Sequence, residues 1–169
     1  MRPALATASA ELDEDELRVA LGRFPTGVAL ATADVGGAPH GLIVSSFTSV
    51  SLRPPLVAFC PSRDSLTWRR MRGAGAFAVN VLAARHAAFA REAAAPGADR
   101  FGGGDVPRGI GGAPLLPDAL AIIECALEAE HAAGDHTIVV GRVLRLAVPC
   151  AGAPLVHWAG GFGRVVPAA

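Results

Sequence analysis

Apolar and polar positions follow a helical repeat near the beginning of the chain. Four apolar residues recur at the i, i+3, i+4 and i+7 spacing that places them on one helical face: Leu17, Ala20, Leu21 and Phe24. Asp13 stands three residues before Glu16, as in a capping box, and Pro25 blocks continuation of the helix. The pattern predicts a helix over residues 13–24, preceded by an Ala-rich flexible tail over residues 1–12.

From Thr26 onward, the pattern changes to short β-like runs that glycine and proline separate. The runs are TGVALATA, HGLIVSS, FTSVSL, LVAFC, GAFAVNVL, AIIECALEAE, HTIVVGRVLRLAV, APLVHWA and GFGRVV. Alternation in AIIECALEAE places Glu124 on the polar face of its strand. From this pattern we expect roughly seven strands and two or three helices. The strands and helices do not alternate regularly. This pattern favours a mainly β fold, an antiparallel barrel with flanking helices, over a doubly wound sheet.

Two further helices and one long irregular segment lie between these strands. Residues 65–72 suit a short helix capped by Asp64 or Ser65, and residues 85–95 suit an Ala-rich helix. Residues 96–118 contain seven glycines and four prolines. An irregular stretch of this length within a compact domain indicates either a functional loop or an error in assigning its neighbours.

The length of 169 residues fits a single domain, which we assign to residues 13–169. A composition that is 51% hydrophobic and 18% charged is typical of a folded chain rather than a disordered one. No apolar run approaches the ~20 residues of a membrane span, and the acidic start lacks the basic region of a secretory signal. We therefore expect a cytoplasmic protein that does not bind membranes.

Charge and residue usage exclude several classes of chemistry. Fifteen positive and fifteen negative side chains leave no net charge, so the overall field does not favour nucleic acid as a partner. All fifteen cations are arginine, and the chain contains no lysine and no tyrosine. These absences exclude Schiff-base chemistry, a P-loop lysine and a tyrosine general acid. Three widely spaced cysteines without a CxxC pair predict no disulfide framework.

Familiar catalytic and cofactor motifs do not occur. The sequence has no G-x-S-x-G elbow, and its five histidines lack the spacing of a zinc site, so we expect no metal. Residues 73–78 fit G-x-G-x-x-A, but a dinucleotide fingerprint follows a strand and opens a helix. Here the match precedes the strand-like run AFAVNVL. Any nicotinamide cofactor is therefore expected to bind without a Rossmann fold.

Two hydroxyl-rich segments remain, and both suit a phosphate-bearing ligand. SSFTS, residues 45–49, forms a turn between strands, and PSRDSLT, residues 61–67, opens a helix. A helix N-terminus offers free N–H groups and a positive dipole to an anion. Four side chains of the second segment can complete such a cradle: Ser62, Arg63, Ser65 and Thr67. Alternatively, Ser65 only caps the helix, and the hydroxyls are ordinary surface turn residues.

Other candidates keep both a structural and a functional interpretation. His136 follows Gly134 and Asp135 at the start of a long strand, where it is either a structural residue or a site residue. Trp68 is expected to pack rather than to stack on a ligand. Four arginines form either a solvated helix face or a docking surface for a negatively charged cofactor: Arg63, Arg69, Arg70 and Arg72.

Six segments, taken in order, resemble those of a known family. They are FPTGVALAT, HGLIVSSFTSVSLRPPLVAFC, GAFAVNVL, RFGGG, IECALEAEHAAGDHTIVVGRV and PLVHWAGGFGRV. The chain resembles the flavin reductase-like family, which has the FMN-binding split-barrel fold, from about residue 23 to residue 164. More narrowly, it is similar to the short reductase components of two-component flavin-dependent monooxygenases.

The resemblance implies a split β-barrel that forms a homodimer, with the flavin ring in a groove at the dimer interface. By motif position, contact with the flavin ring and its ribityl phosphate falls to Thr26, Val44, Ser45, Ser46 and Phe47. Phosphate binding is completed by Pro61, Ser62, Ser65 and Thr67, in agreement with the helix-start argument that also includes Arg63. His136 matches a position associated with the nicotinamide face, and Phe101 and Trp158 flank that pocket.

The function implied by the resemblance is hydride transfer from NADH or NADPH to FMN or FAD. The reduced flavin would then pass to a separate flavin-dependent monooxygenase. The two cofactors carry the redox chemistry, so a chain without lysine, tyrosine or metal ligands can still be an enzyme. His136 would orient the nicotinamide. Two alternatives remain open: a non-catalytic flavin- or haem-binding split barrel, and a flavin oxidase of the pyridoxamine-phosphate type.

Overall fold

The computed structural model describes residues 13–95, 97–98, 100–101 and 106–166. The predicted tail over residues 1–12 lies outside the described residues. The helices are α1 (Glu14–Leu21), α2 (Leu66–Met71) and α3 (Ala87–Ala94). The strands are β1 (Thr26–Gly27), β2 (Ala29–Val35), β3 (Ala38–Val44), β4 (Thr48–Leu52), β5 (Pro55–Phe59), β6 (Ala76–Val81), β7 (Ala121–Ala133), β8 (His136–Ala147), β9 (Leu155–Trp158) and β10 (Gly161–Arg164). The prediction of a mainly β fold with a few helices is confirmed, although the described residues form ten strands rather than roughly seven.

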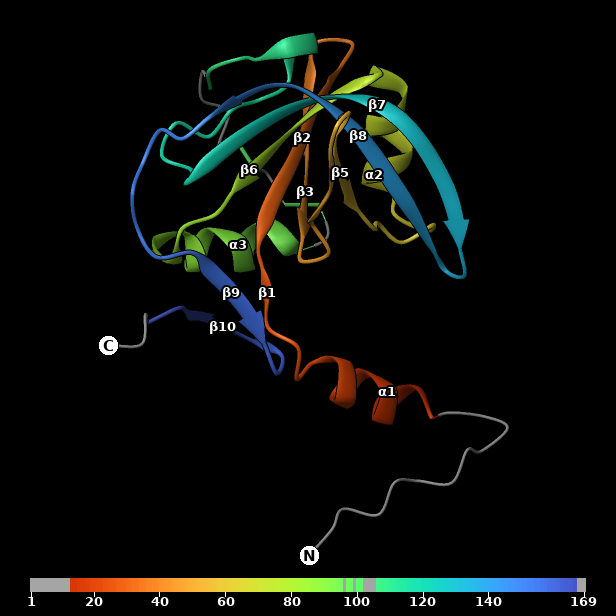
Figure 1. The fold of residues 1–169 in the computed structure, drawn as a ribbon, viewed down its shortest axis with the longest axis vertical. Coiled ribbons are helices and arrows are strands. Elements are labelled where there is room, and N and C mark those ends of the chain that lie inside the picture. Colours follow the sequence, from red (N-terminus) through yellow and green to blue (C-terminus); the bar gives the residue numbers. More distant parts are fainter. Residues whose placement is uncertain (1–12, 96, 99, 102–105, 167–169) are drawn as a thin grey trace, which may run out of the picture.

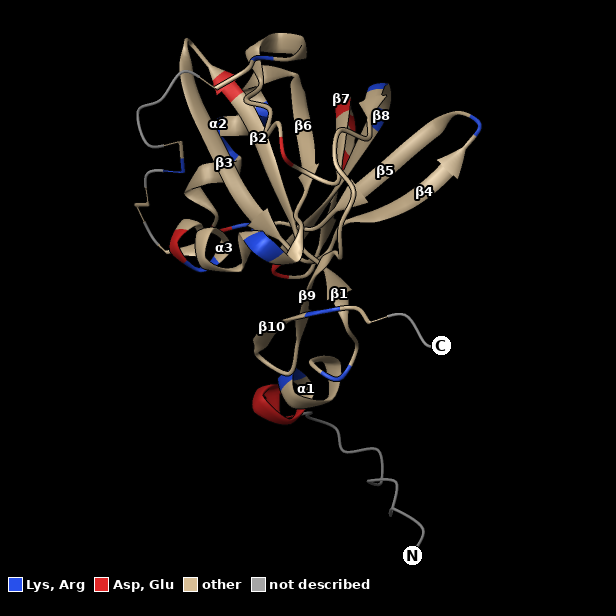
Figure 2. Ribbon diagram, turned by 90° about the vertical axis from the view of Figure 1, so that its left-hand side faces the viewer, with Lys and Arg blue, Asp and Glu red and all other residues tan. Residues whose placement is uncertain are grey.

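The body of the molecule is a seven-stranded antiparallel sheet with the order β3-β2-β6-β7-β8-β5-β4. Its two edge strands, β3 and β4, are joined by only residues 45–47, so Val44 and Thr48 lie within about 15 Å of each other. The sheet therefore curls until its edges approach at this end, and Figure 2 shows the two strands diverging toward the other. No ladder joins β3 to β4 among the described residues, so a closed barrel is not observed.

A buried aromatic cluster fixes α2 against the curled sheet. Phe59 of β5 packs edge-to-face on Trp68 of α2, with ring centroids 5.2 Å apart, and on Phe77 of β6 at 5.5 Å. Ser65 caps the helix, because its Oγ accepts the Trp68 N–H at 3.1 Å. The predicted helix and its cap are thus confirmed, and Trp68 packs as expected. The burial of Trp68 and Met71 places the start of α2 next to the edge strand β3.

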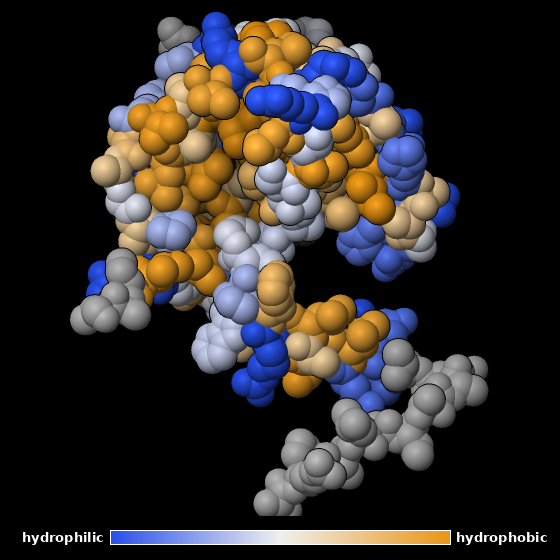
Figure 3. All heavy atoms as spheres, viewed as in Figure 1, coloured by the Kyte–Doolittle hydropathy of each residue, from blue (hydrophilic) through white to orange (hydrophobic). Residues whose placement is uncertain are grey.

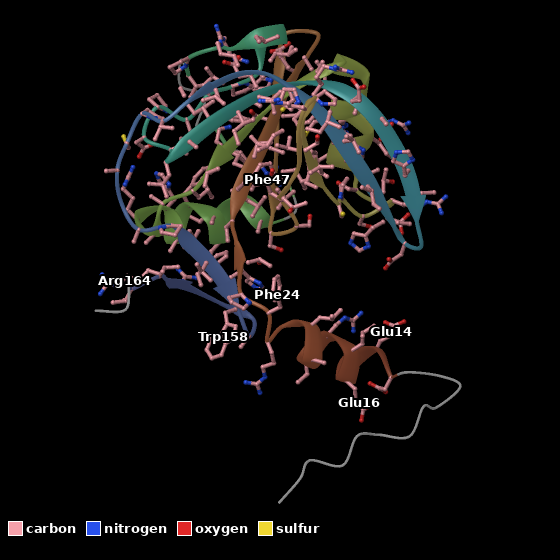
Figure 4. All side chains as sticks on the ribbon, in the orientation of Figure 1. Glu14, Glu16, Phe24, Phe47, Trp158 and Arg164 are labelled. Atoms are coloured by element: carbon pink, nitrogen blue, oxygen red, sulfur yellow. The ribbon has the colours of Figure 1, made fainter. Side chains whose placement is uncertain are left out.

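A smaller sheet with the order β1-β9-β10 carries α1 away from the body (Figure 1). We call these four elements the arm. The first helix was predicted over residues 13–24, but α1 ends at Leu21, so Phe24 lies beyond it, and none of the helix residues is buried. Leu21 is 65% exposed and Phe24 is 74% exposed. Figure 3 shows apolar surface on the outside of the arm, and Figure 4 shows Phe24 and Trp158 projecting from it.

The described part of the Gly- and Pro-rich segment, residues 106–118, is tied to the sheet. Thr32 Oγ1 donates to Pro114 O at 2.6 Å, and the Leu116 N–H donates to Asn80 Oδ1 at 2.8 Å. The segment also covers Glu124, whose carboxylate accepts the Ile110 N–H at 2.6 Å and pairs with Arg145. Glu124 is therefore only 4% exposed, although alternation placed it on the polar face. Across the described residues, no helix is long and apolar enough to cross a membrane.

Candidate cofactor-binding site

A pocket of about 480 Å³ lies where the curled sheet brings the end of β3, the end of β5 and the start of β8 together. Seven of the residues predicted from sequence line it: Val44, Ser45, Ser46, Pro61, Ser62, Ser65 and His136. Three residues that were not predicted complete the lining: Leu42, Ile43 and Cys60. We call this the serine pocket. Residues distant in sequence therefore converge at one place, as the motif positions implied.

In the serine pocket, a side chain that follows β3 is hydrogen-bonded to the backbone that follows β5. Ser46 Oγ accepts the Cys60 N–H at 2.8 Å and lies 3.4 Å from Cys60 O. This contact continues the pairing of β4 with β5, in which Thr48 lies opposite Ala58. Ser45 is exposed on the pocket wall, so its hydroxyl faces solvent or a ligand. Of these two adjacent serines, Ser46 builds the site and Ser45 is available to bind.

Backbone hydrogen bonds hold His136 against residues 61–62, which precede α2. An isolated antiparallel bridge joins Ser62 to His136, and the Thr137 N–H donates to Pro61 O at 2.9 Å. The imidazole Nδ1 lies 2.8 Å from the Asp135 carboxylate, which leaves Nε2 for another partner. This hydrogen bond holds the pKa of Asp135 below its ordinary value. Asp135 was not predicted as a site residue, although it stands beside His136 in the Gly-Asp-His sequence.

The hydroxyls at the start of α2 each make one structural bond and keep one donor. Ser62 Oγ accepts the Asp64 N–H at 3.2 Å, just as Ser65 Oγ accepts from Trp68. A hydroxyl that accepts one bond still carries a hydrogen that it can donate. Capping and ligand binding are therefore compatible for Ser62 and Ser65. The helix has only six residues, so its dipole adds little, and the hydroxyls are the main donors here.

The remaining predicted residues lie outside the serine pocket. Thr67 and Phe101 line a neighbouring hollow of about 480 Å³, which we call the cationic hollow because it also contains Arg70 and Arg100. Arg63 lines a third hollow of about 440 Å³ on the other side of α2, described below as the paired hollow.

Three other predicted positions lie farther away. Phe47 packs against the main core. Thr26 and Trp158 belong to the arm, where Thr26 pairs with His157 and the Trp158 indole N–H donates to Arg23 O at 3.2 Å. These three residues do not line the serine pocket within this chain.

The residues that sequence reasoning missed on the pocket wall are apolar or small. Leu42 and Ile43 precede Val44 on β3, and their position beside a predicted contact was the available signal. Cys60 carried no such signal, because a lone cysteine after an apolar strand reads as a core residue. The result is a pocket with an apolar wall on one side and hydroxyls on the other, which is the usual make-up of a small-molecule site.

Comparison with known proteins decides the family. Residues 21–165 match the model of the flavin reductase like domain. The chain belongs to the flavin reductase-like family. An FMN reductase (NADH) from Agrobacterium fabrum, one of the flavin reductases that it resembles, is 43% identical over 151 residues, covering 87% of this chain and 83% of that protein.

Solved structures of this flavin reductase-like family share the fold described above. An NADH:FAD oxidoreductase from Streptomyces globisporus, solved in complex with NAD and FAD fragments, is 39% identical, with a TM-score of 0.85. The match covers 94% of this chain and 98% of that one. The flavin reductase component of a bacterial two-component tryptophan halogenase is 37% identical, with a TM-score of 0.84, over 92% of this chain and 100% of that one.

Proposed function

We propose that this protein is a flavin reductase that uses NADH or NADPH to reduce FMN or FAD and releases the reduced flavin to a separate flavin-dependent monooxygenase or halogenase. The observation that carries the proposal is the serine pocket, where the two serine-containing segments, residues 45–46 and 61–65, lie beside His136. Its volume of about 480 Å³ falls within the range of small-molecule sites.

The donor set of the serine pocket fits a flavin with a phosphate. Val44 and Ile43 offer an apolar wall for a planar ring, and Ser62 and Ser65 offer hydroxyl donors for the ribityl phosphate. The bound cofactors supply the hydride donor and the hydride acceptor. The chain's own part is to bind, orient and exclude water. His136, held by Asp135, would orient the nicotinamide through Nε2.

The proposal includes a homodimer, supported by the arm. Leu17 and Leu21 on α1 and Phe24 just after it are exposed, and an isolated helix of eight residues is not stable in water. A second copy that covers these side chains would bury them, and it would also bring a second arm toward the first chain. Thr26 and Trp158 could then approach the partner's serine pocket, as the resemblance implies for a groove at the dimer interface.

The test is a turnover assay with the purified full-length chain. Each nicotinamide is mixed with each free flavin, and loss of nicotinamide absorbance is followed at catalytic protein concentration. We expect flavin-dependent oxidation with at least one pair. Bound flavin or haem without turnover in all four mixtures would instead support the non-catalytic binding protein.

The variant His136→Asn tests the role of the imidazole. We expect kcat/KM for the nicotinamide to fall about tenfold, because the substrate is less well oriented, while the flavin Kd is unchanged. His131→Asn is the matched control, since His131 is an exposed histidine on the same β7–β8 hairpin and outside the pocket lining. An equal effect of the two substitutions would contradict the assignment of His136.

A further inference from the structure

The cationic hollow lies beside the serine pocket, and the proposed function does not use it. Its wall is formed by the edge strand β3, one face of α2, residues 97–98 and residues 100–101. Three of its lining side chains can carry positive charge: His40, Arg70 and Arg100. No aspartate or glutamate lines it among the described residues. A hollow of about 480 Å³ with this lining attracts an anion.

The two arginines of the cationic hollow lack the partners that arginine normally finds. Arg70 makes no hydrogen bond or ion pair with any described residue. Arg100 donates from Nη1 to Ala98 O at 3.0 Å, but its Nε is buried without a hydrogen-bond partner in the described structure. A buried, unsatisfied donor costs free energy unless a ligand completes it. Arg70 is therefore available to an acceptor that enters the hollow, and Arg100 lines the same hollow with an unsatisfied Nε.

The cationic hollow and the serine pocket adjoin, because neighbouring residues line the two cavities. Gly41 lines the hollow and Leu42 lines the pocket on β3, while Leu66 and Ser65 do the same at the start of α2. The close approach of Arg100 and Phe101 favours a glycine, since a Cβ at Gly41 would lie 3.1 Å from both Arg100 Cδ and Phe101 Cζ. The hollow begins at Leu66, next to Ser65, on the side where the flavin phosphate is proposed to bind.

We infer that the cationic hollow binds the adenosine diphosphate half of FAD, so that this chain prefers FAD to FMN. The inference rests on the proposed function, which places the flavin ring and its first phosphate in the serine pocket. The added phosphate meets Arg70 and Arg100, whose planar guanidinium groups suit phosphate oxygens. The base meets the apolar surface of Phe101 and of Leu66, which is 66% exposed.

NADH also contains an adenosine diphosphate group, so the ligand chemistry alone has two sources. The position of the hollow favours FAD. It adjoins the serine pocket next to Ser65, whereas His136, proposed to face the nicotinamide, belongs to the lining of the pocket and not of the hollow. The two sources are separable by experiment, because flavin affinity can be measured with no nicotinamide present.

The decisive measurement is the Kd of FAD and of FMN for the full-length chain, from quenching of flavin fluorescence without nicotinamide. We expect tighter binding of FAD in the wild type. Arg70→Met and Arg100→Met should each raise the Kd of FAD about tenfold, as expected for loss of a charge-assisted hydrogen bond, and the Kd of FMN less than about twofold. The matched control is Arg69→Met, since Arg69 lies on the same helix but faces the paired hollow.

Three outcomes would overturn the inference. Equal weakening of FMN and FAD would assign both arginines to the phosphate that the two flavins share. An unchanged Kd of FAD together with a raised KM for NADH, measured with FMN as acceptor, would assign the hollow to the nicotinamide cofactor. An equal effect of Arg69→Met would reduce the result to general charge. Continued flavin reduction in these cases would leave the proposed function intact, whereas absence of turnover with every flavin would contradict that function itself.

Discussion

Two arginine-lined hollows flank the short helix α2, and they differ in what their arginines contact. In the paired hollow, Arg69 lies 3.3 Å from the Asp64 carboxylate, and Arg72 lies 2.6 Å from that of Glu130. In the cationic hollow, Arg70 has no carboxylate partner among the described residues. These three arginines are close neighbours on one helical segment, yet they have different electrostatic surroundings.

The difference teaches that the number of arginines says little about where an anion binds. An arginine paired with a carboxylate is neutralised and contributes to structure, while an unpaired one keeps its field for a ligand. The Glu130 carboxylate also accepts the Trp68 indole N–H at 2.9 Å, which ties the paired hollow to the aromatic core. The paired hollow is therefore read as part of the scaffold, and the cationic hollow as part of the proposed site.

The largest effect is expected where a paired arginine meets a buried carboxylate. Glu124→Gln removes the charge that Arg145 pairs with and weakens the acceptor for the Ile110 N–H. We expect the free energy of unfolding to fall by about 2–3 kcal/mol, measured by chemical denaturation, with flavin affinity unchanged. Glu128→Gln is the control, because Glu128 forms a similar pair with Arg142 on the exposed surface and should matter much less.

The same pair predicts a pH dependence. The hydrogen bond from Arg145 holds the pKa of Glu124 below its ordinary value. A depressed pKa stabilises the fold at pH values above the ordinary glutamate value of about 4.3, and this stabilisation is lost as pH falls through the lower pKa of the folded state. The stability difference between wild type and Glu124→Gln should therefore shrink in acid. A difference that stays constant from pH 7 to pH 3 would show that charge is not its source.

A smaller loss of stability is expected when an arginine of the paired hollow loses its carboxylate partner. Glu130→Gln frees Arg72 but can still accept from the Trp68 indole. We expect a loss of about 1–2 kcal/mol in unfolding free energy, because the Glu130 side chain is largely buried at 17% exposure. The ratio of the FAD and FMN dissociation constants should stay at the wild-type value. A change in that ratio as large as the one expected for Arg70→Met would contradict the assignment of FAD binding to the cationic hollow alone.

The smallest effect on the fold, and the sharpest on the comparison, is expected from giving Arg70 a partner. Leu66→Glu places a carboxylate four residues before Arg70 on the exposed face of α2, the favourable orientation for a helical ion pair. Stability should change little. The Kd of FAD should rise about five- to tenfold, because Arg70 is neutralised, while the neutral control Leu66→Gln should shift it much less. Identical results for the two variants would show that Leu66 acts through apolar contact alone.

Local pattern was enough to predict a mainly β chain and α2 with its Ser65 cap, and motif positions brought Ser62 and His136 to the same site. These features depend on residues close in sequence or on motif positions in a known family. The pairing of the arginines was beyond that reach, since Arg72 meets a carboxylate on β7 that is far away along the chain. Periodicity identified the apolar face of α1 but not what covers it, and alternation could not show that residues 106–118 would bury Glu124.

The exposed face of α1 has a consequence for how fast its backbone amides exchange with solvent. Strands β2 and β6 consist mostly of buried residues, so their amides should exchange with solvent only on global unfolding. The amides of α1 are held by the helix's own hydrogen bonds, and the chain packs no buried side chain behind them. If a second copy covers α1, the protection of its amides from hydrogen exchange should increase with protein concentration. Exchange of these amides would therefore report on dimer formation.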